Sequence, residues 1–275
     1  MASGNFYAGA PPLPSVAGRE GIGRVLEGDA LLAGTHVYFD SPVAPYGSFA
    51  ARAPVKEEGV IELPDGVDDA LTACFGIAGL AAWLSLEWTA GLKEGETVLV
   101  LGASGPVGQI AVQAARVLGA GRVIAAARGA EGLERAQELG AHATVQIGAV
   151  DDLAEAFREA GGGGVDVIVD PLWGEPAAAA VDAANSGARL SQLGQSAGAE
   201  STIRSASVRS KGMVIRGHSN FMAPQEVKRK AFLRMAALGA AGDMTVDLER
   251  VPLDDAADAW RRQGEHPGRK LVLVP

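Results

Sequence analysis

The chain has 275 residues, of which 48% are apolar and 21% charged, and its formal net charge is −9. This composition is typical of a globular protein with one large or two modest domains, and it excludes a disordered chain. Lysine and arginine are scattered over an acidic chain, so nucleic acids and anionic lipids are poor partners. The single cysteine, Cys74, excludes a disulfide framework and a four-cysteine zinc lobe.

Neither a leader nor a membrane span is expected. The first residues lack a basic region followed by an apolar one, as a signal peptide requires. Glycine, proline or charge interrupts every apolar run before it reaches the length that spans a bilayer. We therefore expect a soluble, cytoplasmic protein.

The first third of the chain is rich in proline and glycine and has the character of a β domain. Short apolar stretches between turn residues predict strands at residues 21–26, 35–39 and 47–55. No helical periodicity appears before Asp68. From there to Trp88, small and apolar residues recur at helical spacing and predict a helix.

After Thr97, apolar strands alternate regularly with amphipathic helices. Strands are expected at residues 97–101, 122–126, 143–146, 165–169, 188–193 and 213–216, and helices at 106–118, 131–139, 151–160 and 175–184. Strands that are apolar on both faces and alternate with helices predict a parallel sheet with helices on each side. The tail is expected to hold helices at residues 224–238 and 254–262 and a strand at 270–274.

The strongest local signal is the turn between the first parallel strand and its helix. It reads Gly102-Ala103-Ser104-Gly105-Pro106-Val107-Gly108. Small residues there permit a sharp turn, a close approach of the backbone to a pyrophosphate, and tight packing of helix on strand. The helix N-terminus then offers N–H groups and partial positive charge to the phosphates. We therefore predict a dinucleotide site. A Walker-type loop is excluded, because Gln109 stands where that loop needs a lysine.

The end of the second parallel strand indicates which dinucleotide binds. An NAD site expects Asp or Glu there, to accept hydrogen bonds from the ribose hydroxyls. Here the strand ends in Ala126 and Ala127, and Arg128 follows. A guanidinium can pair with a 2′-phosphate, which a carboxylate would repel. We therefore predict NADP(H) as the cofactor, although Arg128 could also be an ordinary solvated loop residue.

Several further motifs resemble those of the medium-chain dehydrogenases/reductases, specifically their zinc-independent quinone oxidoreductase branch. Besides the glycine turn, they are Pro14-x-x-x-Gly18-Arg-Glu-Gly21-x-Gly23, Ile77-Ala-Gly79-Leu-Ala81-Ala-Trp83, Glu138-Leu-Gly-Ala141, Gly187-Ala-Arg-Leu190 and Gly268-Arg-Lys-Leu-Val-Leu273. The resemblance covers almost the whole chain. It implies an α/β fold with a doubly wound parallel Rossmann sheet and a partial GroES-like β domain. The expected boundaries are residues 1–75, joined by 244–275, for the β domain and 76–243 for the NADP-binding domain.

The chain departs from the family in two respects. Zinc-dependent relatives carry His where this chain has Arg19, and Cys74 lies about one helical turn before their second ligand position, near Ile77. We therefore expect no catalytic zinc and a buried, unreactive Cys74. The family also has strands upstream of the segment that matches Ser3-Gly4. Their absence suggests either an upstream start or a shortened protein with an incomplete β domain.

The resemblance implies hydride transfer from NADPH to a quinone or an activated alkene or carbonyl. Tyr7 matches a family tyrosine at the substrate cleft, whose hydroxyl would hydrogen-bond the substrate carbonyl, and is the expected catalytic residue. Gly194, after the fifth strand, and Phe221, after the sixth, are expected to border the nicotinamide. The alternative for Phe221 is a core residue, and for Tyr7 a half-buried loop residue. A homodimer through the edge of the sixth strand is also implied.

Two other enzyme classes are disfavoured by the sequence. Gly194-Gln-Ser196-Ala-Gly198 matches a hydrolase nucleophile elbow, but residues 199–210 are polar and do not read as the buried helix that an elbow needs. No tyrosine is followed four residues later by lysine, which disfavours a short-chain reductase. The remaining alternative to an enzyme is a non-catalytic NADPH-binding protein or an inactive truncated homologue.

Overall fold

The computed structural model describes residues 13–265 and 267–275, and Tyr7 lies outside this range. The chain forms two compact units. Unit 1 comprises Met1–Ile77 and Gln225–Pro275, and unit 2 comprises Ala78–Pro224. Each unit is described by itself.

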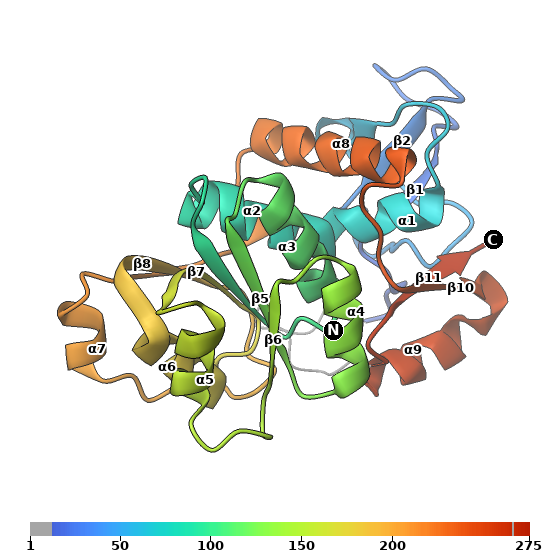
Figure 1. The fold of residues 1–275 in the computed structure, drawn as a ribbon. Coiled ribbons are helices and arrows are strands. Elements are labelled where there is room, and N and C mark those ends of the chain that lie inside the picture. Colours follow the sequence, from blue (N-terminus) through green and yellow to red (C-terminus); the bar gives the residue numbers. More distant parts are fainter. Residues whose placement is uncertain (1–12, 266) are drawn as a thin grey trace. The chain divides into compact units, whose positions relative to one another are not determined.

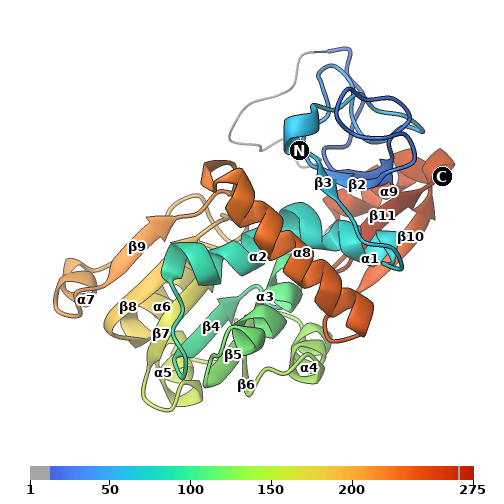
Figure 2. The same cartoon turned by 90° about the horizontal axis from the view of Figure 1, so that it is seen from above.

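A parallel sheet of six strands forms the centre of unit 2 (Figures 1 and 2). Its strands are β4 (Thr97–Leu101), β5 (Arg122–Ala127), β6 (Ala143–Gln146), β7 (Val165–Asp170), β8 (Ala184–Gln192) and β9 (Val214–Gly217). Their order across the sheet is β6-β5-β4-β7-β8-β9, and every neighbouring pair is parallel. The predicted doubly wound Rossmann sheet is confirmed.

Helices cover both faces of this sheet, as right-handed crossovers between parallel strands require. The helices are α2 (Leu80–Leu84), α3 (Pro106–Val117), α4 (Ala130–Glu138), α5 (Leu153–Ala160), α6 (Gly174–Ala183) and the short α7 (Ser205–Arg209). α3 contacts β4 and β5, whereas α5 and α6 lie side by side on the opposite face. The core between these layers consists mainly of aliphatic and small side chains, including Leu99, Leu101 and Ile124, and also contains the buried ring of Phe157.

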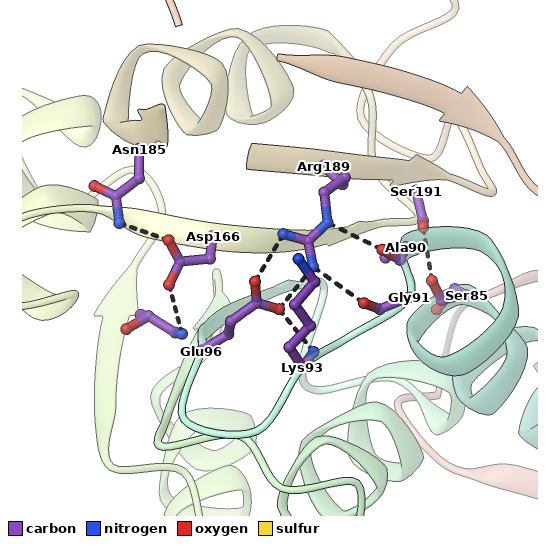
Figure 3. A network of polar contacts seen from close by, with 10 residues as sticks. Ser85, Ala90, Gly91, Lys93, Glu96, Asp166, Asn185, Arg189 and Ser191 are labelled. Atoms are coloured by element: carbon purple, nitrogen blue, oxygen red, sulfur yellow. Dashed lines mark hydrogen bonds and ion pairs between the residues drawn. The ribbon is translucent and has the colours of Figure 1, made fainter. Parts of the chain in front are cut away.

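A polar clasp closes the amino end of this sheet (Figure 3). The Arg189 guanidinium on β8 donates to the carbonyls of Ala90 and Gly91 and to both carboxylate oxygens of Glu96. Beside it, Asp166 on β7 accepts from the Thr97 N–H at 2.9 Å and from the Asn185 side chain at 2.8 Å. The clasp therefore ties β4, β7 and β8 to the segment that leads into the sheet.

Unit 1 contains two small sheets and the helices that pack on them. The antiparallel sheet has β1 (Gly21–Arg24), β2 (His36–Phe39) and β3 (Ile61–Glu62), and the parallel pair has β10 (Leu248–Pro252) and β11 (Lys270–Val274). The helices are α1 (Asp69–Cys74), α8 (Gln225–Ala241) and α9 (Ala256–Gly264), with 3-10 turns η1 (Glu57–Gly59) and η5 (Leu253–Asp255). The strands predicted at residues 21–26, 35–39 and 270–274 are confirmed within a few residues.

The buried centre of unit 1 is organised around Glu20. One of its carboxylate oxygens accepts from Tyr38 Oη at 3.2 Å and from the Ile77 N–H at 2.6 Å, and the other from Lys270 Nζ at 2.8 Å. The Tyr38 ring stacks on Phe232 of α8 with centroids 4.3 Å apart. These contacts hold α8 and β11 against the first sheet, although they lie more than 150 residues away in sequence.

An open cavity of about 1440 Å³ lies within unit 1. It is lined by β1, by residues 48–58, by Trp260 of α9 and by β11. Both β1 and β11 are edge strands, so their outer backbone groups pair with no other described strand. Within the described residues, the β domain is thus an open arrangement of two small sheets.

One sequence-based expectation was wrong. Residues 47–55 form no strand, and only an isolated bridge joins Val55 to Pro42, because turns and bends occupy this proline-containing stretch. The helix expected from Asp68 to Trp88 is confirmed: residues 69–90 form a helical stretch of 22 residues, kinked at Gly76, that is apolar and long enough to span a bilayer. About two thirds of its apolar window is buried inside the protein, as in the core helix of a globular fold.

Candidate active site

The candidate site of unit 2 lies at the carboxyl ends of β4 and β7. From β4 the chain proceeds outward to β5 and β6, whereas from β7 it proceeds in the opposite direction to β8 and β9. A crevice forms where the winding reverses in this way, and ligands of open α/β sheets bind there. The loops that follow β4, β5, β7, β8 and β9 all begin at this edge of the sheet.

The predicted phosphate turn joins β4 to α3 and has a strict requirement for glycine at two positions. Gly102 has φ +64°, a conformation that residues with side chains rarely adopt. A Cβ on Gly108 would lie 2.3 Å from the Gly102 carbonyl oxygen and 2.5 Å from Ala103 Cα. Gly105 is different, because a Cβ there would meet nothing closer than 3.7 Å. The backbone conformation and packing of the turn therefore require glycine at positions 102 and 108. At Gly105 they do not, and the space beside it is open to a ligand.

The first turn of α3 presents unused hydrogen-bond donors at this turn. Gly105 is the N-cap, without a side-chain cap, and Pro106 at the first helical position has no N–H. The N–H groups of Val107 and Gly108 bond to no residue in the described part of the chain. The turn itself is anchored, since Ala103 N–H donates to the Ala126 carbonyl at 3.0 Å. Free N–H groups and the helix dipole together make a site for an anion such as a phosphate.

Arg128 stands exposed at the end of β5, directly after the buried Ala127. Its carbonyl accepts from Gln146 Nε2 at 2.9 Å, which fixes the backbone. Its guanidinium makes no ion pair with a described residue. α4 begins two residues later, and its Gly132 packs so closely on Ser104 that a Cβ there would lie 2.3 Å from Ser104 Cβ. Arg128 is thus an available cation next to the phosphate turn.

Sequence reasoning missed the turn that follows β7. Asp170 is fully buried, and one of its carboxylate oxygens, Oδ1, accepts from the N–H groups of Leu172 and Trp173 at 2.9 and 2.8 Å. Trp173 has φ +57° and ψ −157°, a region that is essentially restricted to glycine. The available signal was an acidic residue at the end of a strand whose preceding three residues, Val167, Ile168 and Val169, are apolar.

The loop after β8, which contains Gly194, is joined to this turn. Leu193 N–H donates to the Asp170 carbonyl at 2.9 Å, and Ala197 N–H donates to the Leu172 carbonyl at 2.8 Å. A Cβ on Gly194 would lie 2.5 Å from the Pro171 carbonyl oxygen, so the loops are in direct contact. The structure places Gly194 at the crevice edge of the sheet, where the sequence pattern predicts it.

A buried histidine organises the segment after β9. Nδ1 of His218 lies 2.7 Å from Thr89 Oγ1, and Nε2 lies 3.1 Å from Asn220 Oδ1. Since an amide oxygen can only accept, Nε2 carries the proton and Nδ1 accepts from the Thr89 hydroxyl. Burial lowers the pKa of His218, which keeps this neutral tautomer. Phe221 follows on the 3-10 turn η4 (Asn220–Met222) and is 52% exposed, so it is a surface residue and not part of the core.

The remaining predicted positions lie in unit 1 or outside the described residues. Tyr7 is outside the described range. Cys74 is fully buried, its thiol donates to the Ala70 carbonyl, and burial raises its pKa to about 12, as expected of an unreactive core residue. Among the described residues no group of three or more His, Cys, Asp and Glu side chains is placed to hold a metal ion.

Known proteins share both sequence and fold with this chain. A family model for zinc-binding dehydrogenases matches residues 106–237. The quinone oxidoreductase of Homo sapiens is 32% identical over 171 residues, which are 60% of this chain and 51% of that protein. The chain belongs to the medium-chain dehydrogenase/reductase superfamily, in its quinone oxidoreductase branch. The resemblance that the sequence motifs indicated is confirmed.

Within this superfamily the chain aligns with proteins of very different length. A phenolphthiocerol/phthiocerol polyketide synthase polypeptide of Mycobacterium tuberculosis is 30% identical over 283 residues, covering 98% of this chain but 12% of that protein. The chain therefore spans between 7% and 51% of the length of the curated relatives it matches. The crystal structure of Escherichia coli quinone oxidoreductase in complex with NADPH is 24% identical and has a TM-score of 0.84, covering 97% of this chain and 84% of that one. That likeness shows the fold, a Rossmann domain with a GroES-like domain.

Proposed function

We propose that this chain is an NADPH-dependent oxidoreductase that reduces a quinone or an activated alkene or carbonyl without zinc. The observation that carries the proposal is the phosphate turn, because its glycines, free N–H groups and position at the sheet's reversal point fit a pyrophosphate. Quinone oxidoreductases among its relatives support the reaction class. Further support comes from the E. coli protein of the same fold, which binds NADPH.

Each part of the site has a role in this proposal. The N–H groups of Val107 and Gly108 hold the pyrophosphate, with Gly102, Ala103, Ser104, Gly105 and Pro106 forming the cradle. Arg128, next to Ala127, pairs with the 2′-phosphate and selects NADP(H) over NAD(H). Gly194 and Phe221 border the nicotinamide, which supplies the hydride when the cofactor is bound.

Tyr7 is proposed to donate a hydrogen bond to the substrate carbonyl as negative charge develops on it. Zinc independence is supported by Arg19, since a guanidinium stands where zinc-dependent relatives place a ligand. We further propose a cytoplasmic protein that acts on small molecules, not on nucleic acid or membranes. A homodimer through β9 completes the proposal.

The test measures oxidation of NADPH, by its absorbance, with an aromatic ortho-quinone and with a simple enone. We expect turnover with at least one of them and no loss of activity in the presence of a zinc chelator. Binding of NADPH without turnover of either acceptor would contradict the enzyme and favour a non-catalytic NADPH-binding protein. Inhibition by the chelator would contradict zinc independence.

Matched glycine variants test the site itself. Gly105→Ala introduces no clash within the protein, so a loss of NADPH affinity in a normally folded variant reports direct contact with the phosphates. We expect its Kd for NADPH to rise at least about tenfold, a change of about 1.4 kcal/mol. Gly264→Ala, at the exposed end of α9 with nothing within 4 Å of its Cβ, serves as the control and should bind normally. Equal affinity of both variants would place the phosphates elsewhere.

A further inference from the structure

Two features of the turn after β7 are costly to the folded protein and have no explanation within it. The second carboxylate oxygen of Asp170, Oδ2, is buried and has no hydrogen-bond partner among the described residues. Three residues later, Trp173 has φ +57° and ψ −157°, a strained conformation for a residue with a side chain. Unsatisfied buried groups and strained residues tend to persist at functional sites, where surrounding contacts hold them in place.

The same turn connects the two loops of the proposed nucleotide site. On one side, a Cβ at Gly102 would lie 3.1 Å from Leu172 Cδ2 and 3.2 Å from Pro171 Cγ, so the turn packs directly on the phosphate loop. On the other side, the carbonyls of Asp170 and Leu172 accept from the Gly194 loop. Asp170 Oδ1, by accepting two N–H groups, sets the shape of the segment between them.

The electrostatic surroundings of Asp170 are nearly free of charge. β4 carries no ionisable side chain, Arg189 on β8 is engaged with Glu96 at the other end of the sheet, and Glu175 of α6 is exposed. Glu87, on the packed segment η3 (Ser85–Ala90), accepts from Trp83, and Glu200 on the Gly194 loop is exposed. Burial raises the Asp170 pKa to about 6, and the two N–H donors oppose that rise. No cation from the described residues compensates its negative charge.

Resting on the proposed function, we propose that Asp170 positions both nucleotide-binding loops and takes up a proton from solvent when the phosphates of the dinucleotide bind beside Gly102. The phosphates bring negative charge next to the turn that Asp170 holds. A buried carboxylate without a counter-ion responds to such charge by becoming neutral. The affinity for NADPH therefore increases as the pH falls.

Calorimetric titration of the full chain with NADPH, in two buffers of different ionisation enthalpy, measures the protons taken up. Between pH 6 and pH 8 we expect net uptake by the wild type and a fraction of a proton less by Asp170→Asn. As the pH is lowered from 8 to 6, the Kd of the wild type should fall by up to about tenfold more than that of the variant. This factor is equivalent to one pKa unit. Because the 2′-phosphate itself titrates near pH 6, the difference between the proteins is the informative quantity.

Asp166→Asn is the matched control, since it removes a carboxylate from the same strand at the amino end of the sheet, within the clasp of Figure 3. It should show wild-type proton uptake. Asp170→Ala removes the acceptor of both N–H groups. Its Kd for NADPH should be about tenfold higher than that of Asp170→Asn. If Asp170→Asn does not fold, the infrared difference spectrum of the wild type decides, because a protonated-carboxyl band must appear on binding.

The outcomes separate the two proposals. Normal NADPH binding with identical proton uptake in wild type and Asp170→Asn, or no carboxyl band, overturns the role of Asp170 and leaves the proposed function intact. Failure of the wild type to bind NADPH overturns the proposed function.

Discussion

Burial of Asp170 makes the stability of the protein depend on pH in an unusual direction. Its carboxyl has a pKa of about 6 in the folded protein, compared with 3.8 as the ordinary value, so the folded state binds the proton more tightly. Between these values the free energy of unfolding should decrease as the pH rises, by about 3 kcal/mol in total. Most carboxylates produce the opposite slope.

Urea unfolding of wild type and Asp170→Asn at several pH values between 4 and 7 measures this effect. The variant should lack the decrease and should approach or exceed the wild type in stability near pH 7. Asp166→Asn should retain the decrease, whatever its overall stability. A wild type whose stability rises through this range in the same way as that of Asp170→Asn would contradict the buried, poorly compensated carboxylate.

At Arg128 the expected change concerns the choice of cofactor. An exposed guanidinium that pairs with a 2′-phosphate contributes about 1.5–3 kcal/mol to the binding of NADPH and nothing to that of NADH. Arg128→Ala should therefore raise the Kd for NADPH by about ten- to a hundredfold and leave the Kd for NADH unchanged. Arg135→Ala, on the solvent side of α4 and paired with Glu138, is the control. An equal loss for both cofactors would assign Arg128 a structural role.

Among the elements, the clasp at the amino end of the unit 2 sheet is expected to be a major source of stability. The Arg189 and Glu96 side chains are 20% and 17% exposed. Removing Arg189 takes this donor from two carbonyls and leaves Glu96 with the Lys93 N–H as its donor among the described residues. Arg189→Ala should lower the free energy of unfolding by about 2–4 kcal/mol. Arg204→Ala breaks a pair whose arginine is 73% exposed and should cost less than about 1 kcal/mol. Thermal unfolding distinguishes the two, and similar losses would refute the comparison.

The elements of unit 2 could be predicted because their patterns are local. β4, β5 and β7 are largely apolar runs between glycine-containing turns, and α3 begins at Pro106 where the pattern placed it. The segments that sequence reasoning missed depend on distant partners. β3 is only two residues long and is defined by its pairing with β2, and β10 by its pairing with β11.

The site divides in the same way. Steric need at Gly102 and Gly108 leaves a visible glycine spacing, so the phosphate turn could be read from the sequence. The Asp170 turn could not, because its significance lies in burial, in a missing hydrogen-bond partner and in the backbone angles of Trp173, none of which a sequence displays. His218 escaped for a related reason, since its partner Thr89 is 129 residues away.

For the whole molecule, the outer edge of β9 indicates how copies of the chain would associate. All four of its residues are exposed, including Val214 and Ile215 at 48% and 36%, and no described strand covers its outer edge. An apolar edge strand invites pairing with another strand, so we expect a homodimer with β9 against β9. Ile215→Lys should convert it to a monomer in sedimentation experiments. Val150→Lys, at an exposed loop position, should not, and a wild-type monomer would end this proposal.

The division of the chain into two units also has a consequence for synthesis. Unit 2 is one uninterrupted stretch, whereas unit 1 is built from two stretches that flank it. The ribosome delivers all of unit 2 before it delivers α8, β10 and β11, on which α1 packs. The N-terminal stretch of unit 1 therefore cannot complete its fold at this stage, because Tyr38 and Glu20 still lack their partners Phe232 and Lys270. Unit 2 needs no later residue and can fold first. A ribosome stalled at a point where residue 224 has just left its exit tunnel should therefore carry a folded unit 2 attached to an unfolded N-terminal stretch.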